Sequence, residues 1–357
     1  MRPSERLLAA VAQPSGPTAY ASVTVLTNQG SGTGVMHSLK RLVLSAAVAS
    51  VLLFIPAATT RAVPLKGTAH LFNVAEQRES QTARLPATVR FREVTGRGLL
   101  VNAWVNGAGP YTFAIDTGAG ATILSRRVAD EAHVYASSRR PLTIGGISGR
   151  GTVAGQEVSV RSLAIGYESN TLPSGGLVIV TETLAPGVDG VLDPTEAYWP
   201  LGFEIDMPRS ELTAFDPHAN PLRRNQNLST DETIVPWLFD GQSRRPFVML
   251  DGRLRALIDT GSGFGLAVTQ DAAMSLGIIQ GRGREQVDVR DISGGQIAAH
   301  RIPPATVNLG GLVLRGIPTD LLPSARAGSP VLLGRDALRP FRLTFDPLNR
   351  LIRIIPG

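Results

Sequence analysis

Two short stretches decide the fold: residues 114–120 read AIDTGAG, and residues 257–263 read LIDTGSG. In each stretch an apolar pair, typical of a buried strand, leads into Asp, Thr and Gly. This pattern predicts a carboxylate at a tight turn, where glycine lets another part of the backbone come close. A single turn of this kind has a simple structural explanation, because Asp often accepts hydrogen bonds from the amides of its own turn.

Three further matches follow the two stretches in the same order along the chain. GISG at 146–149 recurs as DISG at 291–294, GVLD at 190–193 as VLLG at 331–334, and IDMP at 205–208 as FDP at 345–347. The spacing between matched positions stays between 140 and 145 residues. One match could be chance, but four in order at nearly constant spacing indicate a duplicated domain.

The local sequence of each copy favours short strands joined by turns. Turn dipeptides, Asn106-Gly107 and Asp251-Gly252, are flanked by apolar runs in both copies. Ser125 and Thr269 are good N-caps for short helices that follow them. We therefore expect a mostly β fold of two lobes related by a pseudo-twofold axis, in which each lobe is a small closed β-barrel with one short helix.

Composition excludes several classes of function. The 357 residues include no cysteine, which excludes disulfides, zinc-thiolate sites and thiol nucleophiles. The net charge of +6 comes mostly from scattered arginines, which favours an ordinary solvated surface over a nucleic-acid-binding face. The histidines are isolated, and the sequence has no nucleophile elbow, zinc-protease helix or phosphate loop. We expect no cofactor, no metal and no nucleic-acid partner.

The N-terminal region has the pattern of a secretory signal peptide. Lys40 and Arg41 precede an uncharged, largely apolar stretch at 42–55, which is followed by Pro56 and small residues. This stretch is shorter than the about 20 residues that a spanning helix needs, although an uncleaved anchor or a buried helix remains an alternative. We expect an exported protein, periplasmic or secreted, with no stable membrane insertion after the signal is removed. Met36 makes a better start for such a signal than Met1.

The expected domain organisation follows from the repeat and the leader. It consists of a leader at 1–62 with the signal peptide at about 36–62, an N-terminal arm at 63–83, a first lobe at 84–216, a linker at 217–232 and a second lobe at 233–357.

Equivalent lobes packed around a twofold axis would place the two Asp-Thr-Gly turns side by side. Two carboxylates a few ångströms apart cannot both ionise freely, so the pair holds one proton. The ionised carboxylate can then take a proton from a water, while the protonated one hydrogen-bonds a peptide carbonyl. The pattern predicts peptide hydrolysis by Asp116 and Asp259.

On these motifs the sequence, from about residue 85 to 357, resembles the aspartic peptidases of the pepsin and retropepsin type. It looks like two retropepsin-like units fused in one bacterial-looking chain. The resemblance implies the acid-protease fold, a peptide or protein substrate, and a monomer, because one chain carries both lobes. It implies that Asp116 and Asp259 are catalytic and that Thr117 and Thr260 lock the two loops together. It also implies support from Gly118, Gly261 and Ser262, and Gly-rich flaps at Gly146, Ile147, Ser148, Gly149, Ile292, Ser293 and Gly294.

The sequence departs from the family pattern in two places. Neither candidate flap carries the tyrosine of pepsin-like enzymes, and Asp193 stands where the first lobe should have a glycine. Asp193 is either a tolerated turn residue or a disturbance of the first loop. Two other functions compete with an active peptidase: a scaffold that grips an extended peptide without cutting it, and a surface-interaction role of the arginine-rich exterior. Retention of both acids argues against the scaffold that does not cut its peptide.

The first prediction concerns export. We expect cleavage between about Ala57 and Val63, because the small residues there follow the apolar stretch. Mass spectrometry of the mature protein gives its N-terminus directly. An N-terminus upstream of Lys40 would contradict the prediction.

Overall fold

The computed structural model of the protein describes residues 20–21, 23–26, 85–146, 152–173, 176–182, 184–226, 228–241, 243–278, 286–291, 296–323 and 329–357. Contacts group Met1–Asn28 and Leu85–Gly357 into one unit, and Gln29–Arg84 into a second. The expected signal peptide and N-terminal arm lie outside the described residues.

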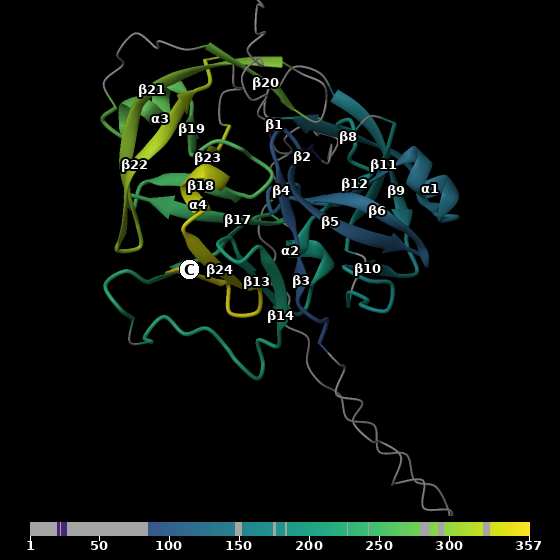
Figure 1. Ribbon diagram of the computed structural model, residues 1–357. Helices are drawn as coiled ribbons and strands as arrows, with labels where there is room; N and C mark the ends of the chain where they lie inside the picture. The colour runs from purple at the N-terminus through teal and green to yellow at the C-terminus, as the bar shows by residue number, and fades with distance from the viewer. Residues whose placement is uncertain are drawn as a thin grey trace, which may run out of the picture. The chain divides into compact units, whose positions relative to one another are not determined.

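The first lobe is built on a ten-stranded sheet (Figure 1). Its strands run in the order β10-β5-β6-β12-β7-β11-β9-β8-β2, and β4 pairs with β5 outside this order. The strands are β2 (Val23–Leu26), β4 (Arg92–Val94), β5 (Gly98–Val105), β6 (Ala108–Ile115), β7 (Thr122–Ser125), β8 (Tyr135–Gly146), β9 (Thr152–Ser159), β10 (Leu163–Ile165), β11 (Val178–Thr181) and β12 (Gly190–Leu192).

The second lobe is built on a nine-stranded sheet in the order β1-β20-β21-β22-β19-β23-β18-β17-β16. The strands are β1 (Tyr20–Ala21), β16 (Leu238–Asp240), β17 (Ser243–Leu250), β18 (Leu254–Asp259), β19 (Leu266–Val268), β20 (Gln286–Asp291), β21 (Gln296–Leu309), β22 (Leu312–Leu321) and β23 (Val331–Gly334).

The two sheets repeat one topology. The order β5-β6-β12-β7-β11 of the first lobe recurs as β17-β18-β23-β19-β22 in the second. The strand that leads into Asp-Thr-Gly, β6 or β18, runs parallel to the strand of the second apolar motif, β12 or β23. The strand after Asp-Thr-Gly, β7 or β19, runs antiparallel to β12 or β23. This repetition confirms the mostly β fold of two pseudo-twofold-related lobes.

The expectation of closed barrels is wrong. Among the described strands, no pairing joins the two ends of either sheet. The alternating pattern of a strand predicts its two faces but not which neighbours its edges pair with. Sequence alone therefore could not distinguish an open sheet from a closed one.

Each lobe has two short helices in its described part, and the expectation of one was wrong. They are α1 (Arg126–Glu131), α2 (Pro194–Ala197), α3 (Gln270–Ser275) and α4 (Arg335–Leu338). Ser125 and Thr269 cap α1 and α3 as predicted, each accepting a hydrogen bond at 3.3 Å from the N–H three residues on. The second helix of each lobe begins directly after the GVLD or VLLG motif.

A six-stranded sheet joins the two copies in the order β15-β25-β24-β13-β14-β3. The matched IDMP and FDP motifs meet here, because β13 and β24 pair with Phe203 opposite Phe345. Their buried rings stack with centroids 4.6 Å apart, and Trp237 packs edge-on against Phe345. The strands are β3 (Val89–Arg90), β13 (Gly202–Asp206), β14 (Glu211–Phe215), β15 (Thr233–Pro236), β24 (Phe341–Asp346) and β25 (Leu351–Pro356).

Two short strands near the N-terminus extend the outer edges of both lobes. β2 pairs antiparallel with β8, with Val23 opposite Gly146 and Leu26 opposite Thr143. β1 pairs in parallel with β20, with Tyr20 opposite Arg290. The outer edges of the β8–β9 and β20–β21 hairpins therefore pair with extended backbone.

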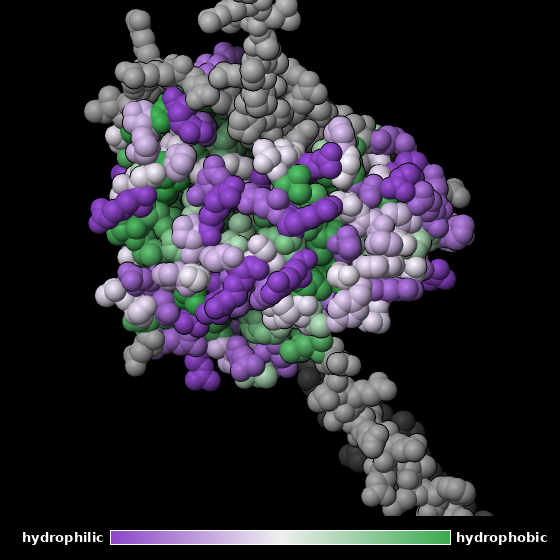
Figure 2. Space-filling model, in the orientation of Figure 1, coloured by the Kyte–Doolittle hydropathy of each residue, from purple (hydrophilic) through white to green (hydrophobic). Residues whose placement is uncertain are grey.

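Hydrophilic side chains are spread over both lobes on the face shown in Figure 2 rather than gathered in one patch. Large exposed hydrophobic residues are few and dispersed among the described residues; they are Leu85, Tyr135, Tyr167, Met274 and Val313. Within that same part of the chain, no helix is long and apolar enough to cross a membrane.

Candidate active site

The two Asp-Thr-Gly turns begin where paired parallel strands end. Asp116 directly follows β6, and its N–H donates to the Leu192 carbonyl of β12 at 2.9 Å. Asp259 ends β18, where it lies opposite Gly334 of β23. In a parallel pair the carboxyl ends of both strands lie at the same edge of the sheet. Each aspartate therefore stands beside the second apolar motif of its own lobe.

The two threonines join the loops by reciprocal hydrogen bonds. Thr117 N–H donates to Thr260 Oγ1, and Thr260 N–H donates to Thr117 Oγ1, both at 3.1 Å. Each hydroxyl also donates to the other lobe: Thr117 Oγ1 to the Ile258 carbonyl at 2.8 Å, and Thr260 Oγ1 to the Ile115 carbonyl at 3.3 Å. Both threonines are fully buried, so each hydroxyl satisfies backbone groups that water does not reach.

The glycines of the two motifs let the carboxylates approach each other. A Cβ atom on Gly118 would lie 2.9 Å from Asp259 Cγ, and a Cβ on Gly261 would overlap the Asp116 carboxylate. Neither position needs a left-handed backbone, so close approach is the reason for glycine here. Each aspartate thus lies over the glycine of the opposite loop.

The two carboxylates are held by turn amides and are almost inaccessible to solvent. Asp116 is 4% exposed and Asp259 is 0% exposed. Asp116 Oδ1 accepts from Gly118 N–H at 2.8 Å, and Asp259 Oδ1 accepts from Ser262 N–H at 3.0 Å. Asp259 Oδ2 accepts no hydrogen bond from an N–H or O–H among the described residues. A proton shared with Asp116 would satisfy it.

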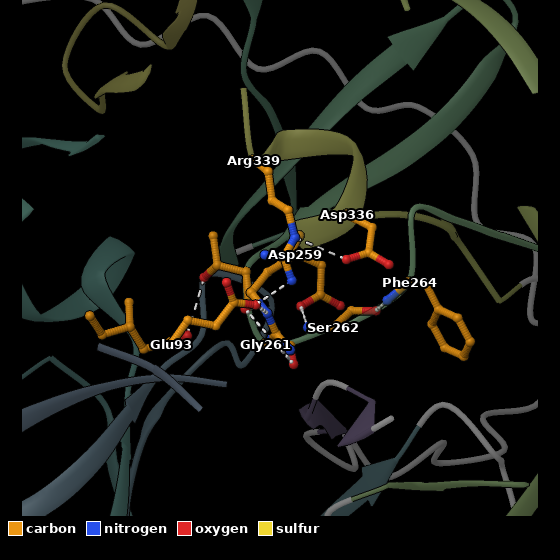
Figure 3. Close-up of polar contacts among 10 residues, drawn as sticks. Glu93, Asp259, Gly261, Ser262, Phe264, Asp336 and Arg339 are labelled. Atoms are coloured by element: carbon orange, nitrogen blue, oxygen red, sulfur yellow. Dashed lines mark hydrogen bonds and ion pairs between the residues drawn. The ribbon is translucent and has the colours of Figure 1, made fainter. Parts of the chain in front are cut away.

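Burial raises the pKa of Asp259 well above its usual range, and the negative charge of Asp116 raises it further. The Ser262 N–H and the Arg335 guanidinium act in the opposite direction. Figure 3 shows the surroundings of Asp259, with Ser262 and Gly261 of its own loop and Glu93 from the first lobe. These surroundings favour the protonated form of Asp259.

Asp193 is a helix cap rather than a disturbance of the first loop. Its Oδ1 accepts from the N–H and the hydroxyl of Thr195 at 2.8 and 2.7 Å, at the start of α2. The matched Gly334 has no room for a side chain, because a Cβ there would overlap the Phe264 carbonyl. Burial raises the pKa of Asp193 well above its usual range, and the charge of Glu196 raises it further.

The sequence did not lead us to predict two features, which are the helix cap at Asp193 and the cation Arg335. The DPTE stretch at 193–196 carries the signals of a helix start, with an Asp cap, Pro at the first position and Glu at the third. Arg335 directly follows the VLLG motif, where the first copy has Pro194. Its Nη1 donates to the carbonyls of Thr260 and Gly261, both at 2.8 Å.

The predicted flap segments are preceded and followed in the sequence by paired strands. Gly146 ends β8, and the β8–β9 and β20–β21 hairpins flank the two segments. The remaining predicted flap residues lie outside the described residues; they are Ile147, Ser148, Gly149, Ile292, Ser293 and Gly294. Their flap role stays a prediction.

In the described part of the chain, no three His, Asp or Glu residues are grouped so that they could hold a metal ion.

Comparison with known proteins gives one family. The aspartyl protease family model matches residues 101–192 and 248–337, once in each lobe. Among solved structures, the chain is similar to the aspartic proteinase from Irpex lacteus, with 15% sequence identity and a TM-score of 0.48. That match covers 76% of this chain and 97% of the other. No curated protein matches this chain in sequence.

The second prediction concerns the threonine hydroxyls. We expect Thr117→Val to lower the free energy of unfolding by about 2–4 kcal/mol, because the Thr260 N–H and the Ile258 carbonyl each lose a buried partner. Thr117→Ser keeps the hydroxyl and is the matched control, with an expected loss of about 1 kcal/mol for the methyl group. Urea unfolding measures both. Equal stability of the two variants would contradict a role for the hydroxyl.

Proposed function

The chain belongs to the aspartyl protease family, and from this premise we propose that it is an aspartic endopeptidase, with Asp116 and Asp259 as the catalytic pair. One observation carries the proposal. The two carboxylates are buried, each lies against the glycine of the other's loop, and reciprocal threonine bonds fix the loops. Such a pair is suited to hold one proton between two acids.

In the resting pair, Asp259 holds the shared proton, because burial and the charge of Asp116 raise its pKa. Asp116 carries the negative charge and accepts from Gly118 N–H. Asp116 takes a proton from a water whose oxygen attacks the peptide carbonyl carbon, while Asp259 donates its proton to the carbonyl oxygen. The product of this step is a neutral tetrahedral diol.

In the second step the peptide bond breaks. Asp116 gives its proton to the amide nitrogen, and Asp259 takes a proton from one hydroxyl of the diol as the carbonyl reforms. The C–N bond cleaves, leaving a carboxylic acid and an amine, and the pair returns to its singly protonated state. No observation favours the alternative of a scaffold that binds peptides without cutting them.

The outer edges of the two hairpins support an extended peptide as substrate. β2 pairs with β8 and β1 pairs with β20, so both hairpins accept an added strand. Strand addition of this kind supplies main-chain hydrogen bonds that do not depend on the side chains of the bound peptide. The substrate is therefore a stretch of unfolded or extended polypeptide that pairs with the flap hairpins of both lobes.

Two further properties belong to the same proposal. The protein is exported, on the evidence of the basic pair and apolar stretch in its leader. It acts as a monomer, because one chain supplies both Asp-Thr-Gly loops.

The third prediction tests the catalytic pair. We expect Asp116→Asn and Asp259→Asn each to lower kcat by about 1,000-fold or more, and the double variant to be little worse, because the two acids act in one step. The assay is cleavage of an unfolded protein between mildly acidic and neutral pH. We expect the rate of the parent to follow a bell against pH whose two limbs belong to the pair.

Asp271→Asn is the matched control, since Asp271 is an exposed residue in the first turn of α3. It should keep the activity of the parent. A single Asn variant at 116 or 259 that keeps most of its activity would remove that aspartate from the mechanism.

The fourth prediction concerns stability against pH. Because the folded-state pKa of Asp259 is raised, its stabilising contribution is present below the unfolded pKa of about 3.9 and is lost as pH rises through the folded pKa. Asp259→Asn removes this loss. We expect the variant to melt at the same temperature as the parent or higher at pH 7, with the difference shrinking toward pH 4. Scanning calorimetry measures it, and a lower melting temperature at pH 7 would contradict the prediction.

A further inference from the structure

A buried cation lies beneath the second catalytic loop. Arg335 begins α4, and its side chain is 8% exposed. Nη1 donates to the carbonyls of Thr260 and Gly261, both at 2.8 Å. These are the two carbonyls that directly follow Asp259 along the chain. One guanidinium nitrogen therefore bridges the turn that carries the aspartate.

The same guanidinium reaches the first lobe. Arg335 Nε lies 3.4 Å from Glu93 Oε1 on β4, and Glu93 also binds Arg339 at 2.7 Å (Figure 3). Gly98, at the start of β5, lies beside the guanidinium, and its φ of +93° is a left-handed backbone conformation that favours glycine. Arg335 thus connects a carboxylate of the first lobe to the catalytic loop of the second.

The matched position of the first lobe does not carry a cation. The residue that matches Arg335 is Pro194, and the preceding Asp193 is a buried acid whose charge would act on Asp116. The surroundings of the pair are therefore unequal. Arg335 bonds the loop that carries Asp259, whereas the charges of Asp193 and Asp116 act on each other.

We propose that Arg335 is a positioning residue of the catalytic pair, which fixes the Thr260 and Gly261 carbonyls and supplies the positive charge that favours the singly ionised pair. The inference rests on the proposed function of Asp116 and Asp259. Hydrogen bonds from a charged donor to two neighbouring carbonyls restrict the turn more tightly than neutral ones. In a water-excluded site, a nearby charge also changes the ionisation of an acid more than it would in solvent.

The electrostatic surroundings support this role. Burial lowers the pKa of Arg335, and the carboxylates of Glu93 and Asp259 oppose that change. Arg335 in turn lowers the pKa of Asp259, against the effect of burial. The charged residues on α4 and on the elements around it include Arg92 and Glu93 on β4, Asp116 and Asp259 in the two loops, Arg315 and Asp320 on β22, and Asp336 and Arg339 on α4 itself.

The fifth prediction uses three variants that separate charge from geometry. Arg335→Met removes both, so kcat should fall about tenfold or more, and both limbs of the pH profile should move up by about half a pH unit or more. Arg335→Lys keeps the charge without the planar guanidinium, so kcat should fall while the limbs stay in place. Glu93→Gln removes the negative charge behind Arg335, so both limbs should move to lower pH, by less because Glu93 is partly exposed.

Arg353→Met is the matched control, since Arg353 is a half-buried arginine on β25 whose ion pair is with Glu232. Its pH limbs should match those of the parent. If the limbs of the pH profile stay at the same pH in both Arg335→Met and Glu93→Gln, the proposal is overturned and Arg335 is only a structural contact. If Arg335→Met does not fold, the direction in which Glu93→Gln moves the limbs of the pH profile decides whether the charge of Arg335 acts on the pair.

A measurement without turnover separates this inference from the proposed function. Carbon-13 titration of aspartate-labelled protein, assigned with Asp259→Asn, gives the ionisation of Asp259 directly. An inactive parent in which Arg335→Met raises the pKa of Asp259 would contradict peptidase activity but retain the charge effect. An active parent in which the titration of Asp259 does not change would contradict the charge effect alone.

Discussion

The hydrogen bonds that Thr117 and Thr260 exchange are the constraint on which the rest of the site depends. Each hydroxyl accepts from the N–H of the opposite threonine and donates to a strand carbonyl of the opposite lobe. The partners are backbone groups, buried and out of reach of water, so a shift of either loop would leave several of them unpaired at once. This cost holds the two carboxylates against each other despite their mutual repulsion.

The sheets bring the loops to that meeting point. Each aspartate stands at the end of a strand whose parallel neighbour, β12 or β23, supports its loop from the same lobe. Below the loops, β13 and β24 pair across the two copies, with Phe203 stacked on Phe345. The lobes are therefore joined by a packed sheet and by the threonines, and the candidate active site lies where the threonines meet.

Much of this arrangement could be predicted from the repeat, because AIDTGAG and LIDTGSG carry both the strand end and the turn in a few residues. The mostly β, two-lobed fold is confirmed; the closed barrels and the single helix per lobe were wrong. Arg335 was not predicted, since its role depends on Glu93, which lies far away in the sequence. The sequence pattern around Arg335 does not predict its contact with Glu93. The flap residues stay a prediction from the motif alone.

The fusion of two lobes in one chain has a consequence for how a substrate lies in the site. Two identical subunits would offer the same surroundings on both sides of the cleaved bond. Here the halves differ: glycine stands at 334 and an acid at 193, and the residue that matches Arg335 is Pro194. A polypeptide has a direction, and reversing it between unlike halves exchanges every contact it makes. The proposed peptidase would therefore distinguish the amino-terminal side of the cleaved bond from the carboxyl-terminal side.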